Sequence, residues 1–172
     1  VIAPSNLWLT IHETVGHPTE LDRALGYEAN YAGTSFCTPE NLDTLQYGSE
    51  IVNLTGDRTA EKALSTIGWD DDGVKTEGKE FAIVKDGIFR NYQMAVGQAA
   101  LIGRDGGSNG CAYSDGCDSI PIQRMPNISL QPGADNSVTV ESLIADVEDG
   151  IFAEGRGSWS IDQQRYNFQF TA

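Results

Sequence analysis

The residues best suited to chemistry in this sequence are two histidines and a glutamate in one short segment. His12, Glu13 and His17 lie in the run HETVGH, and the 172-residue chain has no other histidine. A neutral imidazole is a common metal ligand, and a carboxylate beside it can act as general base on metal-bound water. The segment therefore indicates a hydrolytic metal centre, although two neighbouring histidines can also be structural.

The spacing of the two histidines determines what local structure such a site requires. In the familiar zinc helix, H-E-x-x-H, the histidines are four residues apart and share one face. Here they are five apart, and five steps along a regular α-helix turn the second ring by roughly 140°. One ion could bind both rings only if the helix bulges, tightens or ends between them. Gly16 and Pro18 favour such a break, so we expect a helix over residues 6–15 that unwinds at Gly16 and turns His17 back towards His12.

Two acidic residues follow the second histidine, namely Glu20 and Asp22. Either could accept a hydrogen bond from an imidazole N–H and orient the ring. Either could equally be an ordinary solvated acid. For Glu20 a direct ligand role is a third and less favoured interpretation, and the sequence leaves these alternatives open.

The sequence resembles the TldD/PmbA family of metallopeptidases. That family is marked by an H-E-x-x-x-H segment and a later A-G-T-S-F-like stretch, which here are residues 12–17 and 32–36. Similar blocks follow in the same order at residues 70–73, 108–110 and 124–133. The resemblance covers nearly the whole chain and is closest to the TldD-like catalytic type, in its C-terminal domain region. One departure is Pro126, where the family pattern usually has threonine.

This resemblance implies a zinc metallopeptidase that hydrolyses peptide bonds in unfolded or small peptides. His12 and His17 would ligate Zn²⁺, and Glu13 would act as general base on the zinc-bound water and later pass the proton to the leaving amine. A catalytic zinc usually has a third protein ligand, which in the family is a cysteine close to the C-terminus. None of the three cysteines of this sequence lies in that context: Cys37, Cys111 and Cys117. We therefore expect the third ligand outside this chain, and the chain alone to be inactive.

Family members act in pairs, a catalytic subunit with a related subunit that lacks the histidine motif, and they degrade peptides in the cytoplasm. We accordingly expect a peptide substrate, a homo- or heterodimer with a TldD/PmbA-type subunit, and a cytoplasmic location. Twenty-five acidic against eleven basic residues, a net charge of −14, argue against a nucleic-acid partner, because phosphate binding needs Lys and Arg. The chain has no apolar run of about 18 residues that would indicate a membrane span. The alternative function is a non-catalytic interaction or scaffold domain with structural histidines.

The length predicts one domain. Because family members are longer, residues 1–172 are interpreted as a single metallopeptidase-like domain, a fragment of a longer two-domain protein. The predicted fold class is α+β. We expect a β-rich, largely antiparallel sheet with the metal-site helix near the N-terminus and a second helix near the C-terminus.

The elements that would position the site are mostly strands. Residues 51–54 predict a short strand, and residues 79–84 and 88–92 predict a hairpin around Asp86-Gly87. Apolar residues at helical spacing from 140 to 151, after the N-cap candidate Thr139, predict the second helix. Alternating apolar residues between 159 and 170 predict one or two further strands. The acidic run at 70–73 predicts a turn, because the closing glutamate of a calcium loop is missing.

Overall fold

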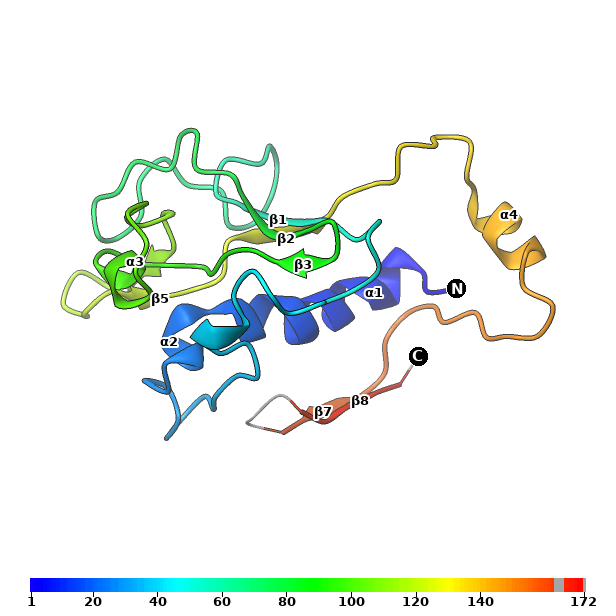
Figure 1. Cartoon of the computed structure of the whole chain (residues 1–172), viewed down its shortest axis with the longest axis horizontal. Helices are drawn as coiled ribbons and strands as arrows, with labels where there is room; N and C mark the ends of the chain where they lie inside the picture. The colour runs from blue at the N-terminus through cyan, green and yellow to red at the C-terminus, as the bar shows by residue number, and fades with distance from the viewer. Residues whose placement is uncertain (163–165, 172) are drawn as a thin grey trace.

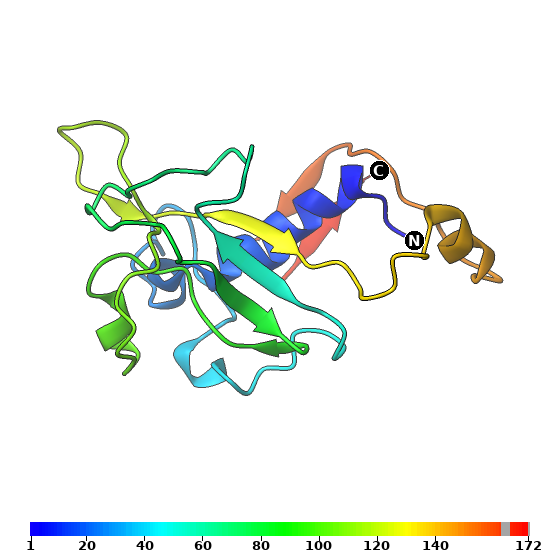
Figure 2. The same ribbon diagram turned by 90° about the horizontal axis from the view of Figure 1, so that it is seen from above.

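The computed structural model describes residues 1–162 and 166–171, and its centre is a helix that begins near the N-terminus. Figure 1 shows a four-stranded sheet on one side of this helix and a two-stranded hairpin on the other. Figure 2, seen from above, shows the helix running between these two layers. The fold is therefore α+β, as the sequence predicts.

The helical segments are short. They are α1 (Pro4–Ile11), a π-helical turn η1 (His12–Gly16), a 3₁₀ turn η2 (His17–Thr19), α2 (Leu21–Ala24), a 3₁₀ turn η3 (Pro39–Asn41), α3 (Gln98–Leu101) and α4 (Val140–Ala145). The strands are β1 (Leu54–Asp57), β2 (Phe81–Lys85), β3 (Ile88–Phe89), β4 (Ala112–Tyr113), β5 (Ile122–Gln123), β6 (Asn127–Leu130), β7 (Trp159–Ile161) and β8 (Phe168–Phe170). Among the described residues, no helix is both long and apolar enough to cross a membrane.

The main sheet is antiparallel with the order β3-β2-β1-β6, so that β6 is an end strand. The predicted hairpin between β2 and β3 is confirmed, and its turn residues Asp86 and Gly87 both have positive φ, at 52° and 76°. This is the conformation for which Asp-Gly is favoured. The predicted strand at 51–54 was wrong in its bounds, because β1 begins at Leu54 and continues through Gly56. Glycine is needed at position 56, since a Cβ on this residue would lie 2.5 Å from the ring of Phe81.

The core lies between the sheet and the helical segment. It contains buried residues from both: Val15, Leu21, Cys37, Leu54, Ile83, Val84, Phe89, Tyr92, Met94 and Ala99. Trp8 of α1 is not part of this core, because the residue is 47% exposed. Its ring instead packs under the guanidinium of Arg156, which also lies over Trp159 of β7. The hairpin is thereby held against α1.

The second predicted helix, α4, is present and begins at a capping box. The Thr139 hydroxyl accepts from the Ser142 N–H, and the Ser142 hydroxyl accepts from the Thr139 N–H. The helix ends at Ala145, earlier than the apolar pattern predicts. Figure 1 shows α4 standing away from the rest of the chain, and its apolar residues are all exposed by more than 40%.

The acidic run at residues 70–73 is a turn that joins separate loops. Asp70 accepts hydrogen bonds from the backbone N–H groups of Val74 and Ala112, Asp71 accepts from Ser114, and Asp72 accepts from Val96. These bonds use the carboxylates to fix loops next to the main sheet. The predicted turn is confirmed.

Candidate metal centre

The five-residue spacing of the histidines is accommodated by a π-helical turn. The His17 N–H donates to the carbonyl of His12, a hydrogen bond across five residues in place of the usual four. The widened turn puts the two histidines one above the other on the same side. The expectation that the helix unwinds at Gly16 was wrong, because Gly16 keeps right-handed helical angles of φ −54° and ψ −68°. The spacing allows one ion to bind both rings if the helix bulges, tightens or ends between them. Here the chain bulges at η1 and then tightens into the 3₁₀ turn η2.

The π-turn frees backbone carbonyls that other residues satisfy. Thr19 donates from its hydroxyl to the carbonyl of Val15 at 2.7 Å. Gln93, which lies between β3 and α3, donates from its side-chain amide to the carbonyl of Gly16 and to the Thr19 hydroxyl. Both side chains are fully buried. A buried carbonyl without a partner is costly, so these contacts stabilise the turn that pairs the histidines.

Gly16 is required for packing. A Cβ on this residue would lie 2.5 Å from Cε and 2.6 Å from Sδ of Met125. Met125 comes from the segment between β5 and β6 and lines the same cleft as His12 and His17. The glycine therefore lets a methionine side chain close against the turn from the opposite wall.

His12, Glu13 and His17 converge at this turn. Among residues 1–162 and 166–171 they form the one group of three or more metal-binding side chains whose ligand atoms all lie within 4.8 Å of one another. The two imidazole rings meet edge to face, with centroids 4.5 Å apart. Two imidazoles beside a carboxylate make a donor set that suits Zn²⁺. The residues present therefore fit the metal that the sequence predicts.

The electrostatic setting of His12 favours metal binding. Burial lowers the pKa of His12, and repulsion from His17 lowers it further, against smaller opposing effects of Glu13 and Glu20. A lowered pKa keeps the imidazole neutral at pH 7. The neutral ring is the form that binds a metal ion.

Glu20 lies against the second histidine and is fully buried. Its Oε2 is 2.9 Å from Nδ1 of His17 and 2.8 Å from Nε of Arg23. Burial alone would raise the pKa of Glu20, but the hydrogen bonds and charges of His17 and Arg23 outweigh it and hold the pKa below its usual range. The interpretation of Glu20 as a solvated acid was wrong.

Asp22 has a different environment, although it too is buried. It accepts hydrogen bonds from the Gln98 side chain and from the Gln123 N–H. Burial raises the pKa of Asp22 above its usual range. Its hydrogen bonds go to α3 and β5, so it connects α2 to those elements.

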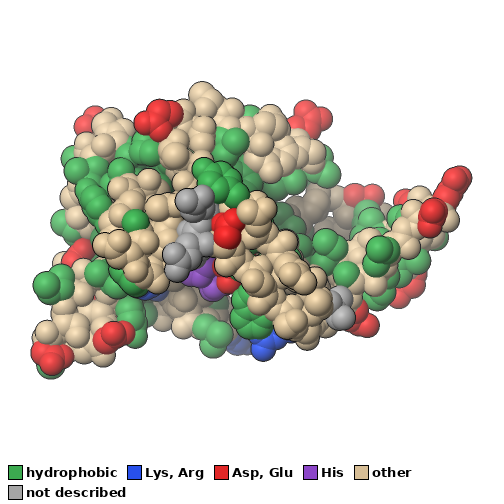
Figure 3. Space-filling model, turned by 90° about the horizontal axis from the view of Figure 1, so that it is seen from below, with side chains coloured by type: hydrophobic (Ala, Val, Ile, Leu, Met, Phe, Trp, Pro, Cys, Tyr) green, Lys and Arg blue, Asp and Glu red, His purple; other side chains and the backbone are tan. Residues whose placement is uncertain are grey.

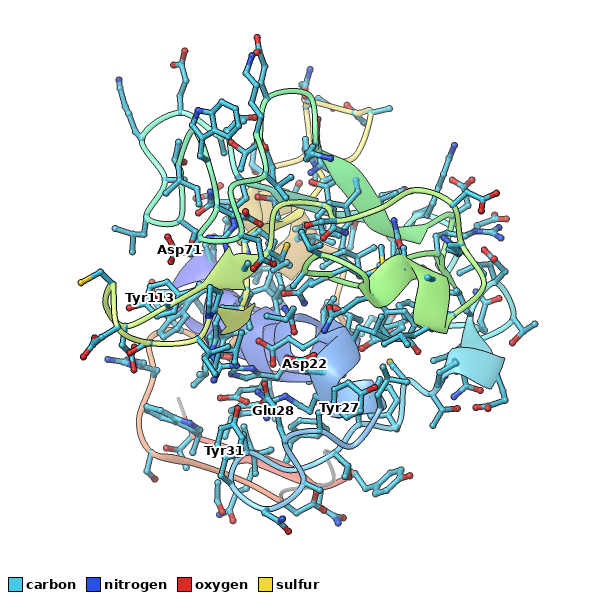
Figure 4. The ribbon with its side chains drawn as sticks, turned by 90° about the vertical axis from the view of Figure 1, so that its left-hand side faces the viewer. Asp22, Tyr27, Glu28, Tyr31, Asp71 and Tyr113 are labelled. Carbon is cyan, nitrogen blue, oxygen red and sulfur yellow. The ribbon has the colours of Figure 1, made fainter. Side chains whose placement is uncertain are left out.

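The contact between Glu20 and Arg23 continues into a buried network of charges. Arg23 Nη2 lies 3.2 Å from Oε2 of Glu28, and Oε1 of Glu28 lies 2.8 Å from Nη1 of Arg124. Arg124 also contacts the Tyr31 hydroxyl at 3.5 Å. Figure 4 shows Glu28 and Tyr31 close together, in the segment that follows α2. Sequence reasoning missed this network, because its contact between Glu28 and Arg124 joins residues 96 apart and no spacing rule connects them.

Clefts border the histidines on two sides. One, of about 520 Å³, is lined by His12, His17, Glu20 and Arg124 and extends to Asp71 and Tyr113, which Figure 4 shows near each other. A second, of about 430 Å³, lies between Glu13, His17 and the first residues of β7. Figure 3 shows only a small area of histidine surface, recessed among its neighbours. The candidate site is thus reachable from solvent through these clefts.

A third, mostly apolar cleft of about 670 Å³ lies between α1 and β6. It shares four residues with the 520 Å³ cleft: His12, Leu64, Ser65 and Met125. The two clefts therefore form one continuous groove past His12. Three residues of the end strand β6 line this groove: Asn127, Ile128 and Ser129.

None of the three cysteines joins the histidine group. Cys37 and Cys111 are buried, Cys117 is exposed, and all three are free thiols. Burial raises the pKa of Cys37 and of Cys111 to about 12. Such thiols are poor metal ligands, because binding requires the thiolate.

Comparison with known proteins gives consistent results. The sequence matches the family described as PmbA/TldA metallopeptidase C-terminal domain over residues 1–172. A metalloprotease of Methanocaldococcus jannaschii is 32% identical over 172 residues, which are 100% of this chain and 35% of that protein. A protein of Saccharolobus solfataricus named zinc metalloprotease TldD homolog is 24% identical over 153 residues, 88% of this chain and 31% of that protein. The chain thus spans about a third of the length of these relatives.

A solved structure supports the fold. The crystal structure of TldE from Thermococcus kodakarensis superimposes with a TM-score of 0.76 at 17% sequence identity, and the match covers 98% of this chain and 35% of that chain. At this identity the likeness concerns the fold. The arrangement of sheet, helix and hairpin is therefore one that a solved protein also has.

Proposed function

Because the chain belongs to the PmbA/TldA metallopeptidase family, over whose C-terminal domain it matches at residues 1–172, we propose that it carries the catalytic residues of a zinc-dependent peptidase. The observation that carries this proposal is the convergence of His12, Glu13 and His17 at one π-turn. A relative that is 24% identical is named a zinc metalloprotease. Zinc also suits the two imidazole donors.

In this proposal His12 and His17 hold the zinc ion, and Glu13 is the general base. When bound, zinc supplies Lewis acidity, which lowers the pKa of water to about 7 and polarises the peptide carbonyl. Glu13 accepts the proton of the attacking water and then donates it to the leaving amine. Glu13 is buried and lines the cleft next to His17. A third protein ligand is expected from outside residues 1–172, since none of the cysteines of this chain reaches the group.

The proposed substrate is an unfolded or small peptide bound in an extended conformation. The groove past His12 is lined in part by β6, which pairs with β1 along one edge and is an end strand of the described sheet. A peptide laid along the other edge of β6 would bind through main-chain hydrogen bonds, which carry little sequence preference. Apolar side chains could enter the part of the groove between α1 and β6.

The proposed partner is a related TldD/PmbA-type subunit. The fold of this chain is also that of a TldE protein, and one of the relatives named above is called a zinc metalloprotease TldD homolog. The apolar residues of α4 are exposed by more than 40%, so this helix has surface available for further protein contacts. A paired assembly is consistent with both observations.

Replacement of Glu13 by glutamine tests this function. In the full-length protein Glu13→Gln should abolish peptide cleavage while leaving the unfolding midpoint and partner binding unchanged, because the amide keeps the shape but cannot accept a proton. Glu61→Gln, at an exposed glutamate of the loop after β1, is the matched control and should cleave at the wild-type rate. Cleavage by Glu13→Gln at the wild-type rate would exclude the mechanism and favour a scaffold domain with structural histidines.

A further inference from the structure

The imidazole of His17 has a buried carboxylate partner, Glu20. Glu20 is 0% exposed, and its Oε2 is 2.9 Å from Nδ1 of His17. The same oxygen accepts from Nε of Arg23 at 2.8 Å and from Nη2 of Arg23 at 2.5 Å. One carboxylate oxygen therefore fixes a histidine and an arginine together.

The positions of the hydrogen atoms around Nδ1 of His17 determine which tautomer of its imidazole is compatible with the contact to Glu20. Nη2 of Arg23 is 3.2 Å from Nδ1 of His17, so in principle Nδ1 could accept from the arginine. However, Oε2 of Glu20 lies nearer to both groups, 2.9 Å from Nδ1 of His17 and 2.5 Å from Nη2 of Arg23. An ionised carboxylate can only accept. Nδ1 of His17 must then donate to Glu20, because otherwise two lone pairs would face each other at 2.9 Å.

We propose that Glu20 is a positioning residue of the metal centre, which holds the proton on Nδ1 of His17 and so leaves Nε2 as the metal donor. This inference rests on the proposed zinc function and deepens it. A metal-binding histidine commonly donates its other ring N–H to a carboxylate, which fixes the ring orientation and raises its basicity. Arg23 keeps Glu20 in place, since two of its nitrogens bind the same oxygen.

Stability alone does not explain the buried charges at this position. Glu20, Arg23 and Glu28 are exposed by 3% or less, and removing such groups from water costs several kcal/mol for each ion. Apolar side chains of similar volume often give equal or better stability. In addition, Oε1 of Glu20 has no hydrogen-bond partner among the described residues. A carboxylate retained in this setting fits a role in orienting His17.

The test uses nitrogen-15 NMR of the full-length protein labelled in the histidine rings, with the signals of His17 identified by their loss in His17→Ala. In the metal-free wild type, His17 should be the Nδ1–H tautomer, with an unprotonated Nε2. Zinc affinity, measured by competition with a chromophoric chelator, should fall by about 10–100-fold in Glu20→Gln. Glu28→Gln is the matched control, because Glu28 is equally buried and contacts the same arginine but does not contact His17. It should keep the tautomer and the affinity, whatever its effect on the unfolding midpoint.

An Nε2–H tautomer in the wild type would overturn the proposal without any mutation. Equal zinc affinities of Glu20→Gln and wild type would overturn it too, as would an equal loss of affinity in Glu28→Gln. Failure of the proposed function would appear separately, as peptide cleavage that survives in Glu13→Gln. That result leaves the tautomer of His17 unaffected, so the two ideas can fail independently.

Discussion

Alanine at Gly16 tests whether Met125 and the π-turn are built to fit each other. The new Cβ would lie 2.5 Å from Cε and 2.6 Å from Sδ of Met125, so the methionine must move. Overpacking of this kind costs about 1–3 kcal/mol, whereas alanine in place of a helical glycine gains about 0.5–1 kcal/mol. The net loss of unfolding free energy in Gly16→Ala should therefore be roughly 0–2.5 kcal/mol.

Gly16→Ala should weaken metal binding as well as stability. Met125 lines the cleft beside His12 and His17, so a displaced thioether intrudes on the space next to the rings. Alanine also favours a regular α-turn over the π-turn that pairs the histidines. We expect the zinc affinity of Gly16→Ala to fall at least tenfold, which corresponds to about 1.4 kcal/mol.

A double-mutant cycle measures this fit directly. Met125→Ala removes the atoms that the new Cβ would meet, so Gly16→Ala combined with Met125→Ala should recover most of the lost zinc affinity. Met125→Ala alone is the control for loss of the thioether itself. Urea unfolding gives the stability and chelator competition gives the affinity of each variant. Additive effects in the cycle, or an unchanged affinity in Gly16→Ala, would refute the packing argument.

Two further predictions concern metal content and thiol reactivity. The full-length protein, purified without chelator, should hold about one zinc per catalytic subunit, and both His12→Ala and His17→Ala should lose it. Equal metal in wild type and both variants by elemental analysis would remove these histidines from the ligand set. In the native chain, an alkylating reagent at pH 8 should modify Cys117 alone, because burial raises the pKa of Cys37 and of Cys111 to about 12. Modification of all three before unfolding, seen by mass spectrometry, would contradict the burial of the other two.

Local sequence was sufficient for features that depend on a few neighbouring residues. The Asp86-Gly87 turn and the N-cap at Thr139 were predictable, because each depends on backbone angles or hydrogen bonds within four residues. The candidate site was predictable to the same extent. Its three members are adjacent in the chain, and a spacing of five already excluded a regular α-helix.

Tertiary structure decided how that spacing is accommodated. The sequence suggested unwinding at Gly16, but the chain forms a π-turn, because Gln93, 77 residues away, satisfies the carbonyl of Gly16. The role of Gly16 was likewise set by a distant residue, Met125. Whether a glycine serves backbone freedom or close packing depends on what lies against it, which local patterns do not encode.

The same holds for the charges around His17. From sequence, Glu20 could be a solvated acid, an orienting group or a ligand, since all three have the same local pattern. Burial and the position of Arg23 decide among them. The link from Glu28 to Arg124 joins residues 96 apart. The sequence by itself determined which groups could bind a metal. Only the folded chain determined which of them are buried and which are paired, because burial and pairing depend on solvent exclusion by segments far apart in the sequence.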